Sequence, residues 1–199
     1  MAFPYHHWNP LTIAEVHQLF HHAPFPWGLA GGYAVEQFLV IAIRVHDDID
    51  IFVFREDQHH VHQWLTEWCL YAADPPGTLR PWSATEWLTI GIHDIWGHHT
   101  NAQAWQLQIM LIETARDAWV SRRHPMIRGQ RNDLIVAYGH IPCIRIEVQL
   151  LYKAKGNREK DRLDFYACLP LLNMGEKQWL RQALQFAHPE GHAWLDMLV

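Results

Sequence analysis

The segment from residue 26 to residue 54 restricts the possible folds more than any other part of the chain. A short apolar run (PWGLA, 26–30) ends at Gly31-Gly32, and the residues that follow place their apolar side chains on one side of a helix. The next run, DDIDIFVF (47–54), has the β-branched and aromatic content of a strand, yet it carries three aspartates. We therefore predict a strand, a tight glycine turn, a helix and an acidic strand, in that order.

The rest of the chain alternates between extended and helical patterns. Residues 104–113 alternate strictly between apolar and polar side chains, which predicts a strand with one buried face. Asn9-Pro10 has the residue types of a helix start. Other predicted elements are a helix at 56–68 with Val61, Leu65 and Trp68 as its apolar stripe, a turn at 74–77, one short strand and a turn within 133–144, and helices from residue 146 onward.

Length and composition bound the organisation of the chain. At 199 residues it fits one domain, or one domain with a modest helical addition. Hydrophobic residues make up 49% and charged residues 19%, a balance typical of a globular protein with a core. The predicted layout is a mixed α/β part, residues 1–144, followed by a helical part, residues 145–199.

Charge and terminal sequence exclude several classes of protein. The formal net charge of -5 gives no broad basic surface, so a nucleic-acid partner is not expected. The N-terminus lacks a signal-peptide pattern, and no apolar run reaches membrane-spanning length. Cys69, Cys143 and Cys168 are odd in number and widely spaced, which favours reduced thiols over a disulfide framework. We expect a cytoplasmic protein without a membrane partner.

The sixteen histidines often stand in adjacent pairs, whose side chains point in different directions on a helix. His59 and His62 share a helical face, but no cysteine and no second spaced pair completes a tetrahedral zinc site. We therefore interpret the histidines as polar surface.

Asp48 and Asp50 are two residues apart, so in a strand they point to the same side with Cα atoms about 6.5–7 Å apart. Two carboxylates that close repel each other unless a positive charge lies between them. One Mg²⁺, with magnesium–oxygen distances of about 2.0–2.1 Å, bridges such a pair, and this arrangement suits phosphoryl or nucleotidyl transfer. The structural alternative is that the two acids cap a helix or form ion pairs with Arg44.

The Gly31-Gly32 pair strengthens the metal hypothesis. Glycines between a strand and a helix let backbone N–H groups approach a phosphate, and the helix N-terminus adds the positive end of its dipole. Either motif alone also occurs as an ordinary turn or a solvated strand edge, but this order and spacing indicate phosphate binding. Arg44 and His46 lie just upstream of the acids, where they can meet phosphate oxygens or pair with the carboxylates.

The combined motif GGYAVEQFL…IRVHDDIDIFVF (31–54) resembles the signature of the nucleotidyltransferases. It most resembles the branch that contains the aminoglycoside 2″-adenylyltransferases and the lincosamide nucleotidyltransferases. Downstream segments resemble successive blocks of that branch: GIHDIWGHH (91–99), WQLQIMLIE (105–113), WVSRR (119–123) and EVQLLYKAKGNREKDRLDF (147–165). The resemblance implies an α+β fold of the polymerase-β-like class, a small twisted mixed β-sheet flanked by helices with a C-terminal helical region.

The resemblance also implies roles for individual residues. Gly31, Gly32 and His46 are expected to bind the nucleotide, Asp48 and Asp50 to hold the catalytic Mg²⁺, and Arg44 to assist catalysis. Lys153, Lys155 or Lys160 is expected near the phosphates, braced by Asp161 and Asp164, although a solvated helix face is the alternative for each lysine. The implied reaction transfers AMP from ATP to a hydroxyl of a small molecule, such as an aminoglycoside-like compound, and releases pyrophosphate.

One position departs from the family pattern. A third carboxylate is usual on a neighbouring strand, but the residue in register is Gln108, which offers an oxygen to a metal yet cannot act as a general base. Either Asp94 or Glu113 takes this role, or one metal is bound weakly, or the activity is reduced or lost. Two further hypotheses stay open: nucleotidyl transfer to a protein or tRNA, and a non-catalytic nucleotide-binding protein.

Overall fold

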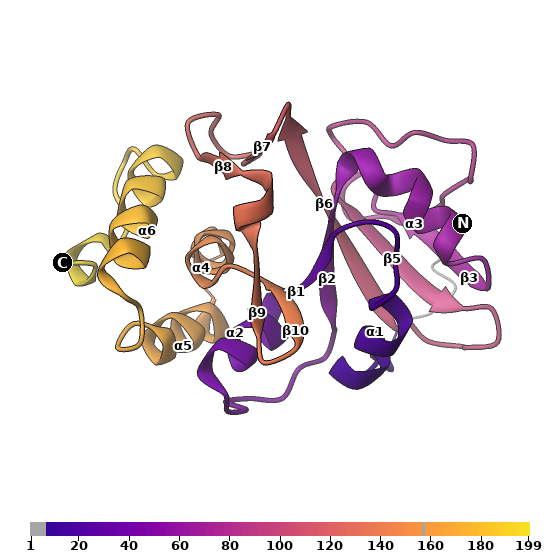
Figure 1. Ribbon diagram of the computed structural model, residues 1–199, viewed down its shortest axis with the longest axis horizontal. Helices are drawn as coiled ribbons and strands as arrows, with labels where there is room; N and C mark the ends of the chain where they lie inside the picture. The colour runs from indigo at the N-terminus through magenta and orange to yellow at the C-terminus, as the bar shows by residue number, and fades with distance from the viewer. Residues whose placement is uncertain (1–6, 157) are drawn as a thin grey trace.

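A mixed β-sheet runs through the centre of the molecule, and the computed structural model describes residues 7–156 and 158–199 (Figure 1). The ten strands are β1 (Trp27–Ala30), β2 (Asp50–Phe54), β3 (Trp68–Ala72), β4 (Arg80–Pro81), β5 (Asp94–His99), β6 (Leu107–Ala115), β7 (Ala118–Val120), β8 (Arg128–Gln130), β9 (Ile135–Tyr138) and β10 (Ile141–Ile144). The α-helices in the described residues are α1 (Ile13–Phe20), α2 (Gly31–Leu39), α3 (Gln58–Trp64), α4 (Ile146–Ala154), α5 (Glu159–Cys168) and α6 (Met174–Ala187).

The strand order is β4-β3-β5-β6-β2-β1-β10-β9, with β7 paired to β6 and β8 paired to β7. β1 and β10 run parallel, as do β2 and β6, whereas the other neighbouring strands are antiparallel. The sheet is therefore mixed, and the α+β prediction is confirmed. The acidic strand β2 lies in its middle, between β1 and β6, so its first residue faces groups from both neighbours.

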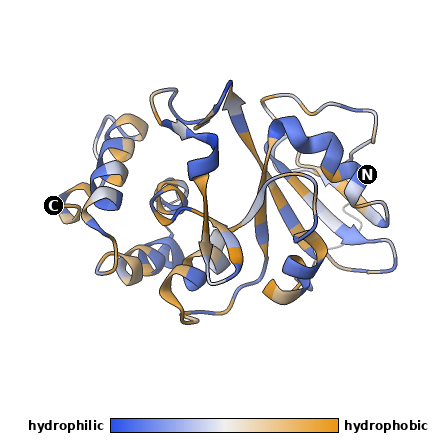
Figure 2. Cartoon of the chain, in the orientation of Figure 1, coloured by the Kyte–Doolittle hydropathy of each residue, from blue (hydrophilic) through white to orange (hydrophobic). Residues whose placement is uncertain are grey.

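The core joins the sheet to the C-terminal helices. α4 packs against α2, α5 and α6, and all but one of its nine residues are buried. Figure 1 shows α4 between the sheet and α6, and Figure 2 shows the hydrophobic residues along the central strands. The buried side chains of both regions form one cluster. The division into residues 1–144 and 145–199 stays a prediction.

The first helix begins later than Asn9-Pro10, so that prediction is wrong. Thr12 is the N-cap: its hydroxyl accepts from the Glu15 N–H at 3.2 Å, and the Glu15 carboxylate accepts from the Thr12 N–H at 2.7 Å. The residues before it follow another course, because the N–H groups of Asn9 and Leu11 donate to carbonyls of the segment that leads into β6. A capping box three residues downstream thus outweighs the Asn-Pro signal.

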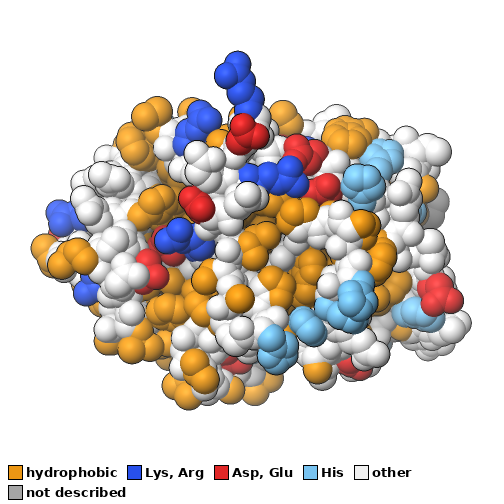
Figure 3. Space-filling model, viewed as in Figure 1, with side chains coloured by type: hydrophobic (Ala, Val, Ile, Leu, Met, Phe, Trp, Pro, Cys, Tyr) orange, Lys and Arg blue, Asp and Glu red, His pale blue; other side chains and the backbone are white. Residues whose placement is uncertain are grey.

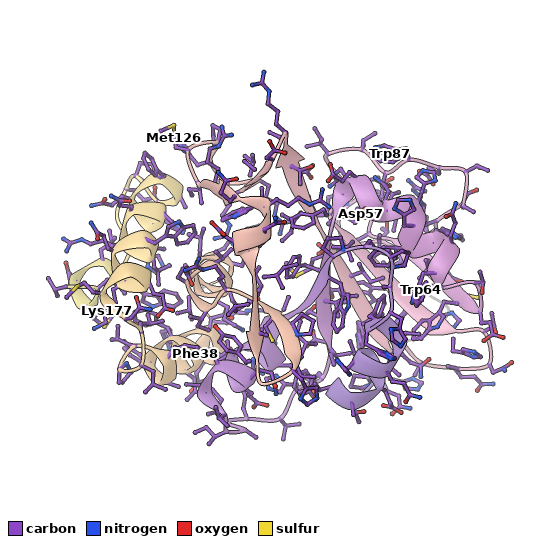
Figure 4. The ribbon with its side chains drawn as sticks, viewed as in Figure 1. Phe38, Asp57, Trp64, Trp87, Met126 and Lys177 are labelled. Atoms are coloured by element: carbon purple, nitrogen blue, oxygen red, sulfur yellow. The ribbon has the colours of Figure 1, made fainter. Side chains whose placement is uncertain are left out.

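The helix predicted over 56–68 is shorter, and placing Trp68 on its apolar stripe is wrong. α3 ends at Trp64, whose indole N–H donates to the carbonyl of Leu19 at 2.9 Å (Figure 4). Trp68 begins β3, where it pairs with His99 of β5. Helical spacing across this boundary is a coincidence of composition, because pairing with a distant strand decides the conformation.

Several strands were missed from sequence. The segment predicted as one strand and a turn, 133–144, holds two strands, β9 and β10, joined at Gly139, which has a positive φ of 63°. β5 includes Gly97 and the pair His98-His99, which are not residues that favour strands, and β7 and β8 have three residues each. Such segments become strands through pairing partners that local patterns do not reveal.

The surface and the cysteines agree with the composition. Histidine side chains gather on the surface of the half of the molecule formed by α1 and α3 (Figure 3), whereas His98 is buried. Cys69, Cys143 and Cys168 are free thiols. Within the residues that the structure describes, no helix has the length and apolarity needed to cross a bilayer.

A buried ion pair fixes the approach to β5. Arg55, 5% exposed at the end of β2, donates to both carboxylate oxygens of Glu113 at 2.7 and 2.8 Å. Its guanidinium also donates to the carbonyls of Leu88, Thr89 and Ile92, at distances of 2.8–3.1 Å. One side chain thus holds the segment that leads directly into β5.

Replacing Arg55 with methionine removes the donor of the Glu113 carboxylate and of the Ile92 carbonyl. The carbonyls of Leu88 and Thr89 each lose one of two donors. We expect Arg55→Met to lower the free energy of unfolding by about 3–5 kcal/mol, the usual cost of breaking a buried ion pair. Urea unfolding followed by circular dichroism measures this change. Arg181→Met, at an exposed position of α6, is the control and should change stability by less than about 0.5 kcal/mol. Equal effects of the two substitutions would contradict the role of Arg55.

Candidate active site

The turn between β1 and α2 brings a helix start against an acidic residue. Ala30 pairs with Asp50 across the β1–β2 ladder, and Gly31 follows with a positive φ of 66°. A Cβ atom at Gly31 would lie 2.0 Å from the Asp50 carboxylate, so only glycine fits in both conformation and space. The Gly31 N–H donates to the buried Gln149 side chain of α4 at 2.8 Å.

His46 supports the same turn from behind. A Cβ atom at Gly32 would lie 2.1 Å from its imidazole, which is buried and 2.9 Å from the Glu36 carboxylate. The ring also packs on Tyr33 with a centroid distance of 4.4 Å. Sequence reasoning expected His46 to contact the nucleotide; in the structure it packs against Gly32 and is not among the residues that line the cleft described next.

A cleft of about 510 Å³, which we call the glycine cleft, opens at this turn. Its acidic wall contains Gly31, Gly32, Asp48, Asp50, Asp94 and Gln108. Burial and the nearby Asp48 raise the pKa of Asp50 to about 7; Asp94 adds to the rise, and Lys153 and Lys160 act against it. The wall therefore holds more negative charge than it can neutralise by itself, which is the electrostatic condition for binding a cation.

Asp94, rather than Glu113, supplies the additional carboxylate of this wall. Glu113 is held by Arg55 and does not line the glycine cleft. Gln108 pairs with Asp50 in the β2–β6 ladder, and its side-chain N–H donates to Asp94 at 3.3 Å. The amide predicted at the third position thus orients an acid that comes from the next strand, β5.

The opposite wall is basic and comes from the segment around Arg44 and from α4 and α5. Arg44 donates to both oxygens of Asp164 at 3.0 Å, and Lys153 lies 2.6 Å from the same carboxylate. Asp164 is fully buried. Burial acts to raise its pKa, but the hydrogen bonds from Arg44 and the charge of Lys153 outweigh burial and lower it. Asp164 is therefore an anion that braces two cations at the cleft.

Other cations complete this wall, and several were missed from sequence. Arg158 pairs with the buried Asp161 at 2.7 Å, so Asp161 also braces a cation. Lys155 and Lys160 line the cleft, as do Arg122 and Arg123, which follow β7. The block WVSRR was noted in the sequence, but only the turn after β7 brings its arginines to the cleft. Gln149, which accepts from Gly31, was not singled out either.

The carboxylates of the glycine cleft can hold a divalent metal only if water or a bound substrate supplies further ligands. Among the described residues, no group of three or more His, Cys, Asp or Glu side chains is placed to hold an ion. Asp48 and Asp50 offer hard oxygen ligands in a pair, which suits an ion that also keeps water or substrate phosphate in its coordination shell.

Comparison with known proteins identifies the family. The model of the aminoglycoside-2″-adenylyltransferase family matches residues 12–167. The chain belongs to this family. It is accordingly a nucleotidyltransferase, and its family uses ATP and a divalent metal. No curated protein matches the chain.

Solved structures share the fold of this family member at low sequence identity. The crystal structure of the lincosamide antibiotic adenylyltransferase LnuA with lincomycin has a TM-score of 0.54 and 22% identity, covering 80% of this chain and 97% of that one. The solution structure of the antibiotic-resistance factor ANT(2″)-Ia has a TM-score of 0.57 and 15% identity, with coverages of 89% and 93%. The ANT(2″)-Ia crystal structure with adenylyl-2″-tobramycin gives 0.55 and 16%, with coverages of 90% and 98%.

The Asp164 cluster predicts a pH dependence of stability. Because the folded-state pKa of Asp164 is lowered, its contribution is complete above the unfolded-state pKa of about 3.9 and is lost as the pH falls through the folded-state value. We expect Asp164→Asn to lower stability by about 3–5 kcal/mol at neutral pH, because the buried Lys153 and the half-buried Arg44 lose their partner. The difference from the wild type should shrink below pH of about 4.

Urea unfolding over a series of pH values measures this effect. Asp196→Asn, at an exposed position near the C-terminus, is the matched control and should follow the wild type throughout. A stability difference between Asp164→Asn and the wild type that is constant down to low pH would show that Asp164 is not the paired anion.

Proposed function

We propose that this protein transfers AMP from ATP, with Mg²⁺ as the metal, to a hydroxyl group of a small molecule. The observation that carries the proposal is the convergence of Asp48, Asp50 and Asp94 beside the Gly31-Gly32 turn, opposite a basic wall. The cytoplasm, where both ATP and Mg²⁺ are supplied, is the proposed site of action. The antibiotics of the family are the first acceptor class to test.

The nucleotide would lie in the glycine cleft. Its triphosphate would meet Gly31 and Gly32 at the start of α2, where the Gly31 N–H donates to Gln149 and the N-cap residue Ala30 offers no side-chain acceptor. Lys153 and Lys160 would contact phosphate oxygens from the opposite wall, where Asp164 holds Lys153 in place. Arg44 and Arg158, each tied to a buried acid, would add positive charge that does not shift with the ligand.

Asp48 and Asp50 would hold the Mg²⁺, which supplies positive charge for the phosphate oxygens when it is bound. The acceptor oxygen would attack the α-phosphorus of ATP; a new P–O bond forms, and the bond from the α-phosphorus to the leaving pyrophosphate oxygen breaks. Asp94 would take the proton of the acceptor hydroxyl. Gln108 would keep Asp94 in orientation through its hydrogen bond.

The hypotheses that sequence left open have distinct outcomes. The hypothesis of a non-catalytic protein was based on the lack of a third acid, and Asp94 lines the cleft as such an acid. Modification of a protein or tRNA would transfer label from α-labelled ATP to a protein or RNA band, whereas a small acceptor leaves both unlabelled.

Metal-dependent ATP binding tests the site without knowledge of the acceptor. Calorimetric titration should show ATP binding that requires Mg²⁺ and that is lost in the Asp48→Ala/Asp50→Ala variant, because the metal loses both carboxylates. Asp47→Asn, at an exposed position beside them, is the control and should bind like the wild type. Unchanged Mg²⁺-dependent binding in the double variant would refute the metal assignment.

The role of Asp94 is tested by separating binding from turnover. Asp94→Asn should retain Mg²⁺–ATP binding while the rate of AMP transfer falls by about 10²–10⁴-fold, the usual contribution of a general base. Gln108→Ala should cost far less, since it removes one long hydrogen bond and leaves the carboxylate. Pyrophosphate release measures both rates. If Gln108→Asp restored activity to the Asp94→Asn protein, either position could carry the general base. Full activity of the Asp94→Asn protein would show that Asp94 is not the general base.

A further inference from the structure

A second cleft of about 650 Å³ adjoins the glycine cleft, and we call it the outer cleft. Its walls are the turn at 76–77 with His93 on one side and Arg122, Arg123 and His188 on the other. The volume suits a small molecule. Because both clefts are lined by Asp94, a molecule in the outer cleft can present an atom to this carboxylate while a nucleotide occupies the glycine cleft.

The charged residues of the outer cleft are mostly cations. Arg122 and Lys155, which also line the glycine cleft, are exposed, and within the described residues neither side chain has a hydrogen bond or an ion pair. Arg123 donates to the carbonyls of Leu151 and Tyr152 at the end of α4, so no acid neutralises it. Asp94 is the only carboxylate among the described residues that line this cleft.

Histidines contribute polar groups without negative charge. Burial lowers the pKa of His93, and the nearby Arg122 and Arg55 lower it further, against the opposite effect of Glu113 and Asp94. His188 lies on the opposite wall, with its ring 3.5 Å from Glu190. Both rings line the outer cleft, although the His93 Nδ1 lies 3.4 Å from the Arg55 guanidinium and the His188 Nε2 is buried.

We propose that the outer cleft binds the acceptor and selects a hydroxylated molecule with an anionic group, either a carboxylate or a phosphate, over a polycation. The inference rests on the proposed function, because Asp94 serves the reacting hydroxyl. An acceptor with several ammonium groups needs carboxylates as partners, and once Asp94 is committed this cleft offers none. An anion instead meets Arg122 and Lys155, whose charges are not used within the protein.

The test compares acceptor binding by charge. Glucuronate and glucose 6-phosphate are the anionic probes, and tobramycin is the polycationic probe; each is titrated calorimetrically into the protein with Mg²⁺ and a non-hydrolysable ATP analogue, and into the protein alone. We expect at least one anionic probe to bind about tenfold or more tightly than tobramycin. The variant Arg122→Glu/Lys155→Glu should reverse this preference. The control variant Lys177→Glu/Arg181→Glu makes the same change of net charge on α6, at positions that line neither cleft (Figure 4). It should leave the preference for the anionic probe unchanged.

The outcomes separate this inference from the proposed function. Failure of the ATP analogue to bind contradicts the proposed function. The inference about the outer cleft is still decided in that case by the titrations without nucleotide, which compare the affinities for anionic and cationic probes. Tighter binding of tobramycin to the wild type, no binding of either anionic probe, or a preference that the Arg122→Glu/Lys155→Glu variant leaves unchanged would overturn the inference. A preference for only one anionic probe identifies whether carboxylate or phosphate is the group recognised.

Discussion

Repulsion among the carboxylates that face the glycine cleft is the constraint on which the rest of the site depends. Asp50 is half-buried near Asp48 and Asp94, and its pKa is raised first by desolvation and then by repulsion from these two acids. The fold keeps Asp50 in this place because β2 lies between two other strands, and Asp50 cannot turn away without losing its ladder pairs with Ala30 and Gln108. A cation and a basic wall offset this charge, as does protonation of Asp50, whose pKa is about 7.

The basic wall is itself built on buried acids. Asp164 and Asp161 are fully buried, and each takes a cation as its partner. These carboxylates fix Lys153 and Arg158 near the cleft, so that less side-chain entropy is lost when a phosphate binds. Asp164 also ties Arg44, which precedes the acidic strand, to α4 and α5. The same ion pairs therefore stabilise the packing of the helices on the sheet and set the charge of the cleft.

Sequence alone predicted the parts of the site that are local in the chain. The glycine turn and the helices after residue 146 have strong periodicity or turn chemistry, and their positions are confirmed. The acidic strand predicted over 47–54 forms as β2 but begins at Asp50, so Asp48 precedes it. The position of Asp94 was left open, because β5 contains a glycine and adjacent histidines and becomes a strand only by pairing with β3 and β6. The roles proposed for these residues stay predictions, since the geometry shows proximity and not reactivity.

Family membership constrains the nucleotide side of the reaction, whereas the side chains of the outer cleft constrain the choice of acceptor. The family match covers the acidic strand and its glycine turn, the elements proposed to act on the nucleotide that every member shares. The solved relatives are at most 22% identical to this chain, so their antibiotics say little about which side chains meet an acceptor here. The side chains proposed to meet the acceptor are Arg122, Lys155 and the histidines of the outer cleft. Because Asp94 lies at the boundary of the two clefts, it can act as the base for nucleotidyl transfer to different acceptors. The charges around it then determine which molecule receives the nucleotide.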